Sequence, residues 1–272
     1  MACPFLSRTA DTRRSACPGW GHHALARLTG AGRFAQRHHA DVDMRSTQQA
    51  LRQSRDDAVM TDEPILPHLL TACGSLRALL DDPAVPSSWD KASACPPFTV
   101  GGLVAHIQVG LAWFAKLLDG PRLHDPAVRL VPGEHYPTVV GQLPDADNEA
   151  MVAHANARAG KGPDVICVRL NGDVSRLAGH APTLDERDVL DLRPAWPFAM
   201  RVGDFASSRL CEVVIHADDV ACSVGVTVTP DATVVDVLVD LLTRTARARH
   251  GDLAVIRALT RAERAEPVFP VY

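Results

Sequence analysis

The sequence predicts an all-α fold, an antiparallel helical bundle whose helices are joined by long loops. Three observations support this class. Apolar residues recur at spacings of three and four in several segments, which is the period of a helix that buries one face. Capping residues, prolines and glycines stand where these segments begin and end. No two segments show the apolar–polar alternation expected of paired strands, so no sheet is expected.

The composition indicates a soluble protein of ordinary size. The 272 residues suffice for one large domain, or for one domain with an appendage. A net charge of -4 argues against nucleic acid or an anionic membrane as the main partner. No run approaches the roughly 20 consecutive apolar residues that a membrane span needs. The seven cysteines are odd in number and contain no C-x-x-C pair, which favours a reducing cytoplasm over a disulfide framework or a zinc ribbon.

Residues 1–59 show no sustained helical or strand period. Their arginine-rich composition is typical of a transit peptide, and the doublets His22-His23 and His38-His39 are potential metal ligands. We favour a simpler interpretation, in which this segment is a disordered extension or follows from a misassigned start. The expected organisation is then a helical bundle over residues 60–226 and a short helical appendage over residues 227–272.

Two helices are expected in the first part of the bundle. From Met60 an amphipathic helix runs to an Asp-Asp-Pro stop, and its apolar face is formed by Leu66, Leu69, Leu70, Cys73, Leu76 and Leu80. After a connection rich in proline and serine, a second helix begins at Thr99, a good N-cap, and is stopped by Gly120-Pro121. His106 lies within the apolar stripe of this second helix, so we expect it to face the core.

The middle of the chain is expected to alternate long loops with helices. Residues 121–147 and 182–203 are rich in loop-forming residues. A short helix is expected at 148–158, and a further one contains Val165 to Leu177, although Asn171-Gly172 in its middle weakens the helical pattern.

Three helices are expected in the last part of the chain. The first has Asp204 as N-cap and Gly225 just past its end. Thr229-Pro230 opens the second, over 231–249, with proline at its first position. Asp252 caps a final short helix that extends to about Arg264.

Glu212 and His216 are the first candidates for chemistry. They lie four residues apart on one predicted helix, so their side chains share a face and can reach one metal ion. With His106 they supply two imidazoles and one carboxylate, a donor set that leaves a coordination position open, as catalytic metal sites do. The alternatives are a core role for His106 and a solvent-facing polar arc on the later helix, made of Ser208, Arg209, Glu212, His216, Asp219 and Ser223.

Two motifs resemble those of a known superfamily. Phe98-Thr-Val-Gly-Gly-Leu-Val-Ala-His106 is similar to the W-T-V-x-D-L-V-A-H helix of the DinB-like metal-binding bundles. Arg209-Leu-Cys-Glu-Val-Val-Ile-His-Ala-Asp-Asp-Val-Ala, followed by Gly225, resembles the R-x-x-E-x-x-V-H-x-x-D-L-A-x-x-x-G helix of the mycothiol-dependent maleylpyruvate isomerase branch. The resemblance covers roughly residues 62–226 and implies an up-down-down-up four-helix bundle, here with long loops and two extra C-terminal helices.

The resemblance also implies a site and an activity. His106, Glu212 and His216 would be ligands of a divalent metal, zinc being favoured, and a metal-bound thiol would ionise near neutral pH. The activity implied is that of a cytoplasmic thiol-dependent isomerase or transferase acting on a small molecule. In the isomerase, the mycothiol thiolate attacks the cis double bond of maleylpyruvate, and bond rotation with loss of the thiol gives fumarylpyruvate.

Two further polar residues lie one turn from the ligands. Asp219 is expected to accept a hydrogen bond from an imidazole. Arg209 is expected to orient Glu212 or to bind a carboxylate, and is our candidate for binding the cofactor. For both residues, a surface ion pair is the alternative. Cys211 and Cys222 point away from the ligand arc and are expected to serve in packing.

The chain departs from the family pattern in two places. Gly101-Gly102 replaces polar residues at the start of the His106 helix. Only 47 residues follow Gly225, and they indicate two helices instead of the separate α/β domain of the isomerase. A non-catalytic metal-binding or regulatory interaction module on the same bundle is therefore the alternative function, and a metal-activated hydrolase is a third. The predicted helix 231–249, apolar on one side, favours such a module or a homodimer.

Overall fold

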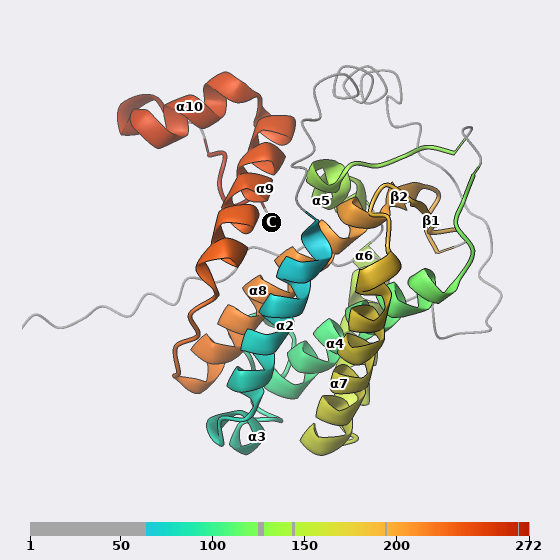
Figure 1. Cartoon of the computed structure of the whole chain (residues 1–272). Coiled ribbons are helices and arrows are strands. Elements are labelled where there is room, and N and C mark those ends of the chain that lie inside the picture. Colours follow the sequence, from blue (N-terminus) through green and yellow to red (C-terminus); the bar gives the residue numbers. More distant parts are fainter. Residues whose placement is uncertain (1–63, 125–127, 143–144, 194, 266, 272) are drawn as a thin grey trace, which may run out of the picture.

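The computed structural model describes residues 64–124, 128–142, 145–193, 195–265 and 267–271. Four long helices pack against one another, as Figure 1 shows: α2 (Ile65–Leu80), α4 (Val100–Asp119), α7 (Pro163–His180) and α8 (Val202–Val224). The only sheet in the described part of the chain has two antiparallel strands of three residues each. The prediction of an all-α, DinB-like bundle is therefore confirmed.

Further elements cover the bundle and connect its helices. The two strands are β1 (Val189–Asp191) and β2 (Ala199–Arg201). The remaining elements are α3 (Ala84–Ser87), η2 (Gly133–His135), α5 (Tyr136–Val140), α6 (Asp145–Ala159), η3 (Ala181–Thr183), α9 (Ala232–His250), α10 (Asp252–Thr260) and η4 (Ala262–Arg264).

Helix α4 is the centre of the bundle. It packs against α6, α7 and α8, so nearly all of its circumference is covered. Among the described helices, α4 alone is long and apolar enough to cross a membrane, yet 78% of its apolar window is buried inside the protein. Its apolar character is thus that of a core helix surrounded by other helices.

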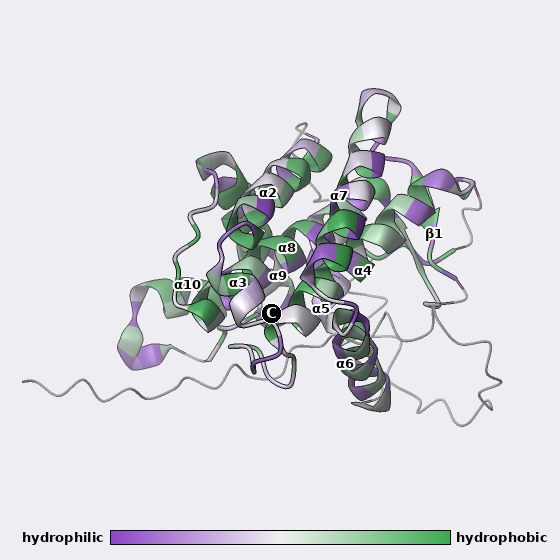
Figure 2. Cartoon of the chain, turned by 90° about the horizontal axis from the view of Figure 1, so that it is seen from below, coloured by the Kyte–Doolittle hydropathy of each residue, from purple (hydrophilic) through white to green (hydrophobic). Residues whose placement is uncertain are grey.

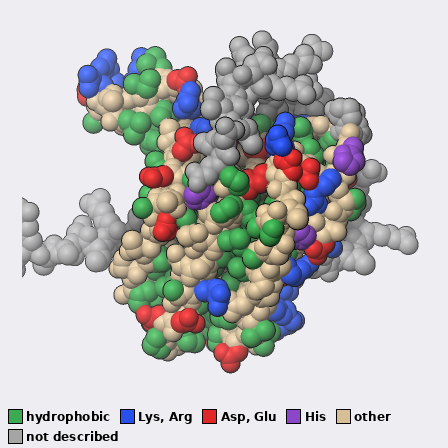
Figure 3. All heavy atoms as spheres, viewed as in Figure 1, with side chains coloured by type: hydrophobic (Ala, Val, Ile, Leu, Met, Phe, Trp, Pro, Cys, Tyr) green, Lys and Arg blue, Asp and Glu red, His purple; other side chains and the backbone are tan. Residues whose placement is uncertain are grey.

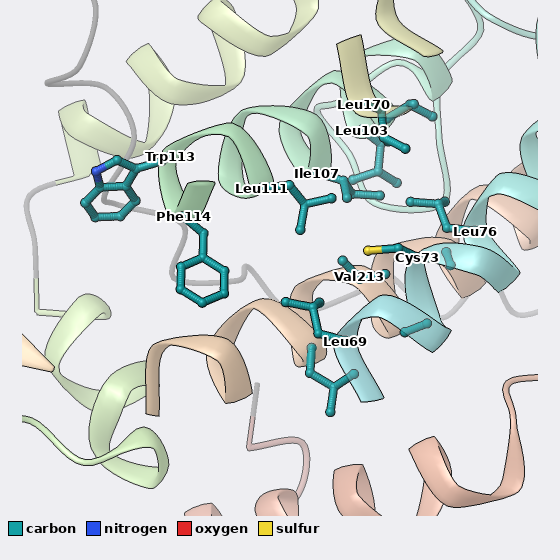
Figure 4. Close-up of a cluster of buried hydrophobic side chains, with 14 of the residues drawn as sticks. Leu69, Cys73, Leu76, Leu103, Ile107, Leu111, Trp113, Phe114, Leu170 and Val213 are labelled. Carbon is teal, nitrogen blue, oxygen red and sulfur yellow. The ribbon is translucent and has the colours of Figure 1, made fainter. Parts of the chain in front are cut away.

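The main core lies where the four long helices meet. Figure 4 shows Leu69, Cys73 and Leu76 of α2 directed toward side chains of the other three helices, which include Leu103, Ile107, Leu111, Leu170 and Val213. The spacing of three and four along α2 and α4 places these residues on one face, as the sequence predicts. The helix α4 that carries His106 and the helix α8 that carries Glu212 are thereby packed on a common apolar base.

The helices α4 and α2 are capped in different ways, α4 by a local residue and α2 by a distant one. Thr99 caps α4 as predicted, because its hydroxyl accepts a hydrogen bond from the backbone N–H of Gly102 at 2.9 Å. Helix α2 has no local side-chain cap. Instead, the carboxylate of Glu186 accepts the backbone N–H groups of Ile65 at 2.8 Å and Leu66 at 2.7 Å. A loop residue more than a hundred positions away in the sequence therefore accepts the first backbone N–H groups of α2.

The two predicted long loops contain regular structure, which corrects the sequence analysis. The first holds η2 and α5, and α6 already begins at Asp145. The second forms the β1–β2 hairpin, in which Leu190 pairs with Met200. Backbone contacts with the first loop extend this hairpin, since Ala199 donates to the carbonyl of Arg129 at 2.9 Å. Strands of three residues are too short to show an alternation that the sequence would reveal.

The boundaries of α8 and α9 also differ from expectation. Helix α8 begins at Val202, because carbonyl groups of the preceding loop accept its first N–H groups; the N–H of Gly203, for example, donates to Glu186 at 2.9 Å. Asp204 therefore lies inside the first turn and does not cap it. Helix α9 is capped by the carboxylate of Asp231, which accepts the N–H of Thr233 at 2.9 Å, so Pro230 lies outside the helix.

The last two helices pack beside the bundle to different extents. Helix α9 lies against α2, α8 and η2, whereas α10 contacts mainly α9 and stands away from the bundle in Figures 1 and 2. The helix expected from Asp252 to Arg264 ends at Thr260, and η4 follows it. The division near residue 226 remains a prediction. The predictions for residues 1–59, including the two histidine doublets, lie outside the described residues.

Candidate metal centre

Helices α4 and α8 bring the three predicted ligands together. His106 projects from α4, and Glu212 and His216 project from α8 one turn apart. His106 is 4% exposed and His216 is fully buried, while the side chain of Glu212 retains 12% exposure. The alternative of a solvent-facing arc on α8 is wrong, because this arc faces the interior of the bundle.

One carboxylate oxygen lies between the two imidazoles. Oε2 of Glu212 is 3.2 Å from Nε2 of His106 and 3.2 Å from Nε2 of His216. The two imidazole rings are 5.3 Å apart between centroids and nearly perpendicular, at 81°. One potential ligand atom from each residue lies within 4.8 Å of the others. The two nitrogens and one oxygen therefore converge on one small volume.

Asp219 fixes the orientation of His216. Its Oδ2 lies 3.0 Å from Nδ1 of His216, on the opposite side of the ring from Glu212. Burial opposes protonation of this imidazole, but hydrogen bonds to Asp219 and Glu212 outweigh it and raise the pKa of His216 to about 9. With the ring held at Nδ1, the Nε2 atom is directed toward Glu212 and His106.

His106 has a different electrostatic environment. Burial lowers the pKa of His106, and the hydrogen bond to Glu212 only partly counteracts that effect. The ring of Phe98, from the residue just before the α4 cap, lies 5.3 Å from the His106 ring. His106 is therefore expected to be neutral, the state in which an imidazole nitrogen binds a metal.

Arg209 is a buried cation beside the three ligands. It is 3% exposed, and its Nη2 donates a hydrogen bond of 2.7 Å to the hydroxyl of Tyr136. Its guanidinium carbon lies 5.1 Å from the centroid of the Phe205 ring and 5.5 Å from that of Tyr136. Burial raises the pKa of Tyr136 to about 12, so this hydroxyl stays neutral and accepts from the guanidinium. Arg209 therefore lies inside the protein and not on its surface, where the alternative interpretation placed it.

Arg209 lines the same narrow space between α4 and α8 as His106 and Glu212. Besides His106, Arg209 and Glu212, its lining includes Gly110 of α4. A Cβ atom at Gly110 would lie 2.9 Å from Nη1 of Arg209, closer than such contacts occur in proteins. A glycine at this position therefore permits the guanidinium to lie against α4.

Both predicted loops reach this region. Tyr136 comes from the first loop, and Trp196 of the second stacks on it, with ring centroids 5.4 Å apart and an angle of 9°. Sequence reasoning did not identify Tyr136. The only available signal was its rarity, since the chain contains two tyrosines.

Cys95 is a second residue near the site that sequence reasoning missed. Its sulfur lies within 4.8 Å of potential ligand atoms of both His216 and Asp219. It belongs to the connection before α4, far from either motif, so no pattern in the sequence indicates its position. Cys95 is buried.

The two cysteines of α8 have different environments. Cys211 is buried against Leu238 and Leu241 of α9, in agreement with the expected packing role. Cys222 is exposed, so the same expectation is wrong for it. Eleven residues, about three turns of α8, separate these two positions.

Comparison with known proteins identifies a family. A family model described as the mycothiol maleylpyruvate isomerase N-terminal domain matches residues 69–221, more than half of the chain. No curated protein and no solved structure matches the chain. The matched segment contains His106, Glu212 and His216, and it ends before α9.

Proposed function

Because the chain belongs to the mycothiol maleylpyruvate isomerase N-terminal domain family, we propose that it binds a divalent metal and uses it in a thiol-dependent reaction. The family is metal-binding and associated with mycothiol. The proposed ligands are His106, Glu212 and His216. The observation that supports this most strongly is the convergence of their three ligand atoms within 4.8 Å, from two helices, inside the bundle.

The residues fit a metal ion in kind and in placement. Two imidazole nitrogens and one carboxylate oxygen are donors that zinc accepts in catalytic sites. The contact between Asp219 and Nδ1 of His216 supports the same role, because metal-bound histidines commonly donate their other ring N–H to a carboxylate. Zinc is therefore the metal that we propose. When bound, it would lower the pKa of a thiol so that a thiolate exists near neutral pH.

The protein's own contribution would be to position an anionic group and exclude water. Arg209 supplies a permanent positive charge beside Glu212, and Tyr136 holds its guanidinium against the α4 face at Gly110. We propose that Arg209 binds an anionic group of the thiol cofactor or of the substrate. The proposed substrate is a small unsaturated acid of the maleylpyruvate type. The rings of Phe205 and Trp196 would keep this side of the site dry.

Metal analysis of the full chain tests the ligand proposal. We expect a single zinc ion per chain by elemental analysis after dialysis against trace zinc, and loss of that zinc in His106→Ala, Glu212→Gln and His216→Ala. His180→Ala is a matched control, since His180 on α7 is half-buried and pairs with Asp119. Retention of zinc by all three ligand variants would contradict the proposed site.

Turnover distinguishes the catalytic proposal from a binding module on the same bundle. The zinc-loaded chain should isomerise maleylpyruvate only when mycothiol is present, and His216→Ala should abolish the reaction. A chain that holds zinc at these ligands but shows no thiol-dependent turnover would favour a regulatory or interaction module instead. Hydrolysis of a substrate in the absence of a thiol would favour a hydrolase that activates water.

A further inference from the structure

Helix α10 carries an apolar stripe that is exposed in the part of the chain that the structure describes. Leu253, Ile256 and Leu259 recur every three residues and are 57%, 54% and 67% exposed. Among the described residues, α10 packs instead through Val255, which is 3% exposed and lies beside Ala246 and Val271. Large apolar residues grouped on one exposed helix face indicate a surface that is covered by another molecule.

Helix α9 carries a second apolar surface of the same kind. Val235 and Val239, one turn apart, are 37% and 56% exposed. The buried side of α9 is formed instead by Val234, Leu238 and Leu241, which are 8% exposed or less. Helix α9 is therefore apolar on two faces, of which only one packs against the bundle.

The two surfaces have opposite charges. Residues 232–243 of α9 contain Asp236 and Asp240, and Asp240 also pairs with Arg244 of the next turn at 2.9 Å. Residues 253–261 contain Arg257 and Arg261 and no acidic residue. In Figure 3, acidic side chains lie along the outer side of α9, and basic side chains lie on the projecting end that α10 forms. Each apolar surface thus has a charged border that complements that of the other.

Within one chain these surfaces do not cover each other. Gly251, with φ 84°, separates α9 from α10. The side chains of Arg247 and Asp252, which lie on the two sides of that turn, form an ion pair of 2.6 Å. Val255 then packs on Ala246 of α9, which directs the Leu253–Leu259 stripe away from its own helix α9.

We propose that the chain forms a homodimer in which α10 of each copy packs on the Val235/Val239 face of α9 of the other. In such an arrangement the same contact between α10 and α9 occurs twice, with the roles of the two copies exchanged, as two-fold symmetry requires. The apolar stripe of α10 would lie on the two valines, and Arg257 and Arg261 would lie beside Asp236 and Asp240 of the partner. The inference does not depend on the metal site.

The mass of the full chain in solution tests this proposal. By sedimentation velocity from low to high micromolar concentration, we expect a species of twice the chain mass of 29.2 kDa. Ile256→Asp and Val239→Asp should each give the monomer, because each places a charge in the apolar contact. Val168→Asp is the matched control: Val168 is 70% exposed on α7, away from both surfaces, and its substitution should leave the dimer intact.

Charge exchange provides a test that a folding defect cannot imitate. Asp236→Arg with Asp240→Arg should weaken the dimer through repulsion from Arg257 and Arg261. Adding Arg257→Asp and Arg261→Asp to the same chain should restore it. A monomer at every concentration would overturn the proposal, and so would a dimer that Ile256→Asp and Val239→Asp leave unchanged.

Discussion

The imidazole of His216 is held at both ring nitrogens, by Asp219 at Nδ1 and by Glu212 at Nε2. These two contacts determine which nitrogen faces the proposed metal. Asp219→Ala removes one of them without touching the three ligands. We therefore expect zinc affinity to fall roughly 10- to 100-fold, as measured by competition with a chromophoric chelator.

Asp218→Ala is the neighbouring control for this prediction. Asp218 is exposed and belongs to the same turn of α8, so its loss should leave zinc affinity unchanged. Equal affinities for the wild type and Asp219→Ala would show that His216 is oriented by packing alone.

Asp204 makes stability depend on pH. Burial raises the pKa of this carboxyl to about 6 from the ordinary 3.8, although the N–H of Gly133 stabilises the charged form. A carboxyl with a raised pKa binds more protons in the folded state than in the unfolded state. The contribution of Asp204 to the free energy of unfolding is thus fully present below about pH 4 and is lost as the pH rises through about 6.

The variant Asp204→Asn should remove this dependence, because an amide does not titrate and its oxygen can still accept from Gly133. In urea denaturation, the free energy of unfolding of the wild type should decrease between these two pH values by more than that of the variant. The difference should be at most about 3 kcal/mol. Glu134, Arg201 and Arg244 also act on Asp204 and are present in both proteins. Identical pH profiles would refute the assignment.

At the scale of the elements, α2 depends on a residue outside itself. The Glu186 carboxylate accepts two N–H groups at the first turn of α2 and also places negative charge at the positive end of the helix dipole. Glu186→Ala should therefore lower the free energy of unfolding by about 1–2 kcal/mol in chemical denaturation. Asp185→Ala, which loses an exposed ion pair and a backbone hydrogen bond with Arg187, should change it by less than about 0.5 kcal/mol. An equal effect of both would contradict the capping role.

Whether an element depends on local or on distant residues explains how much of it the sequence could predict. The long helices follow from apolar spacing, which is local, and Thr99 caps α4 from within its own segment. The start of α8, by contrast, depends on backbone hydrogen bonds to carbonyl groups of the loop before it. The β1–β2 hairpin depends on backbone hydrogen bonds with the segment before η2. Periodicity carries no information about such long-range backbone contacts.

The residues of the candidate site also fall into those that local sequence patterns predict and those that tertiary packing places. Glu212 and His216 share a helix face by spacing alone, and the family motif supports His106 as the third candidate ligand. Tyr136 and Cys95 come from loops whose path depends on tertiary packing, so no pattern placed them beside Arg209 and His216. The burial of the polar arc on α8 was equally undetermined, because helical spacing does not tell which face meets the bundle.

For the whole molecule, the proposed metal would join α4 to α8 across more than a hundred residues of chain. Because those residues converge only in the folded state, bound zinc should stabilise the fold, by about 2.7 kcal/mol when free zinc exceeds its dissociation constant 100-fold. Thermal unfolding should shift upward with zinc and downward with a chelator. His216→Ala should not respond, and an equal response in that variant would place the stabilising zinc elsewhere.

The stacking of Trp196 on Tyr136 has an optical consequence. The Trp196 ring also lies 5.7 Å from that of Trp113, and Tyr136 holds Arg209. Trp89, by contrast, is bonded to the carbonyl of Ala159 at the end of α6. A ligand that displaces Arg209 would disturb the Tyr136–Trp196 stack and alter intrinsic fluorescence. The chain thus carries its own indole reporter, by which binding at the site can be followed in real time without a label.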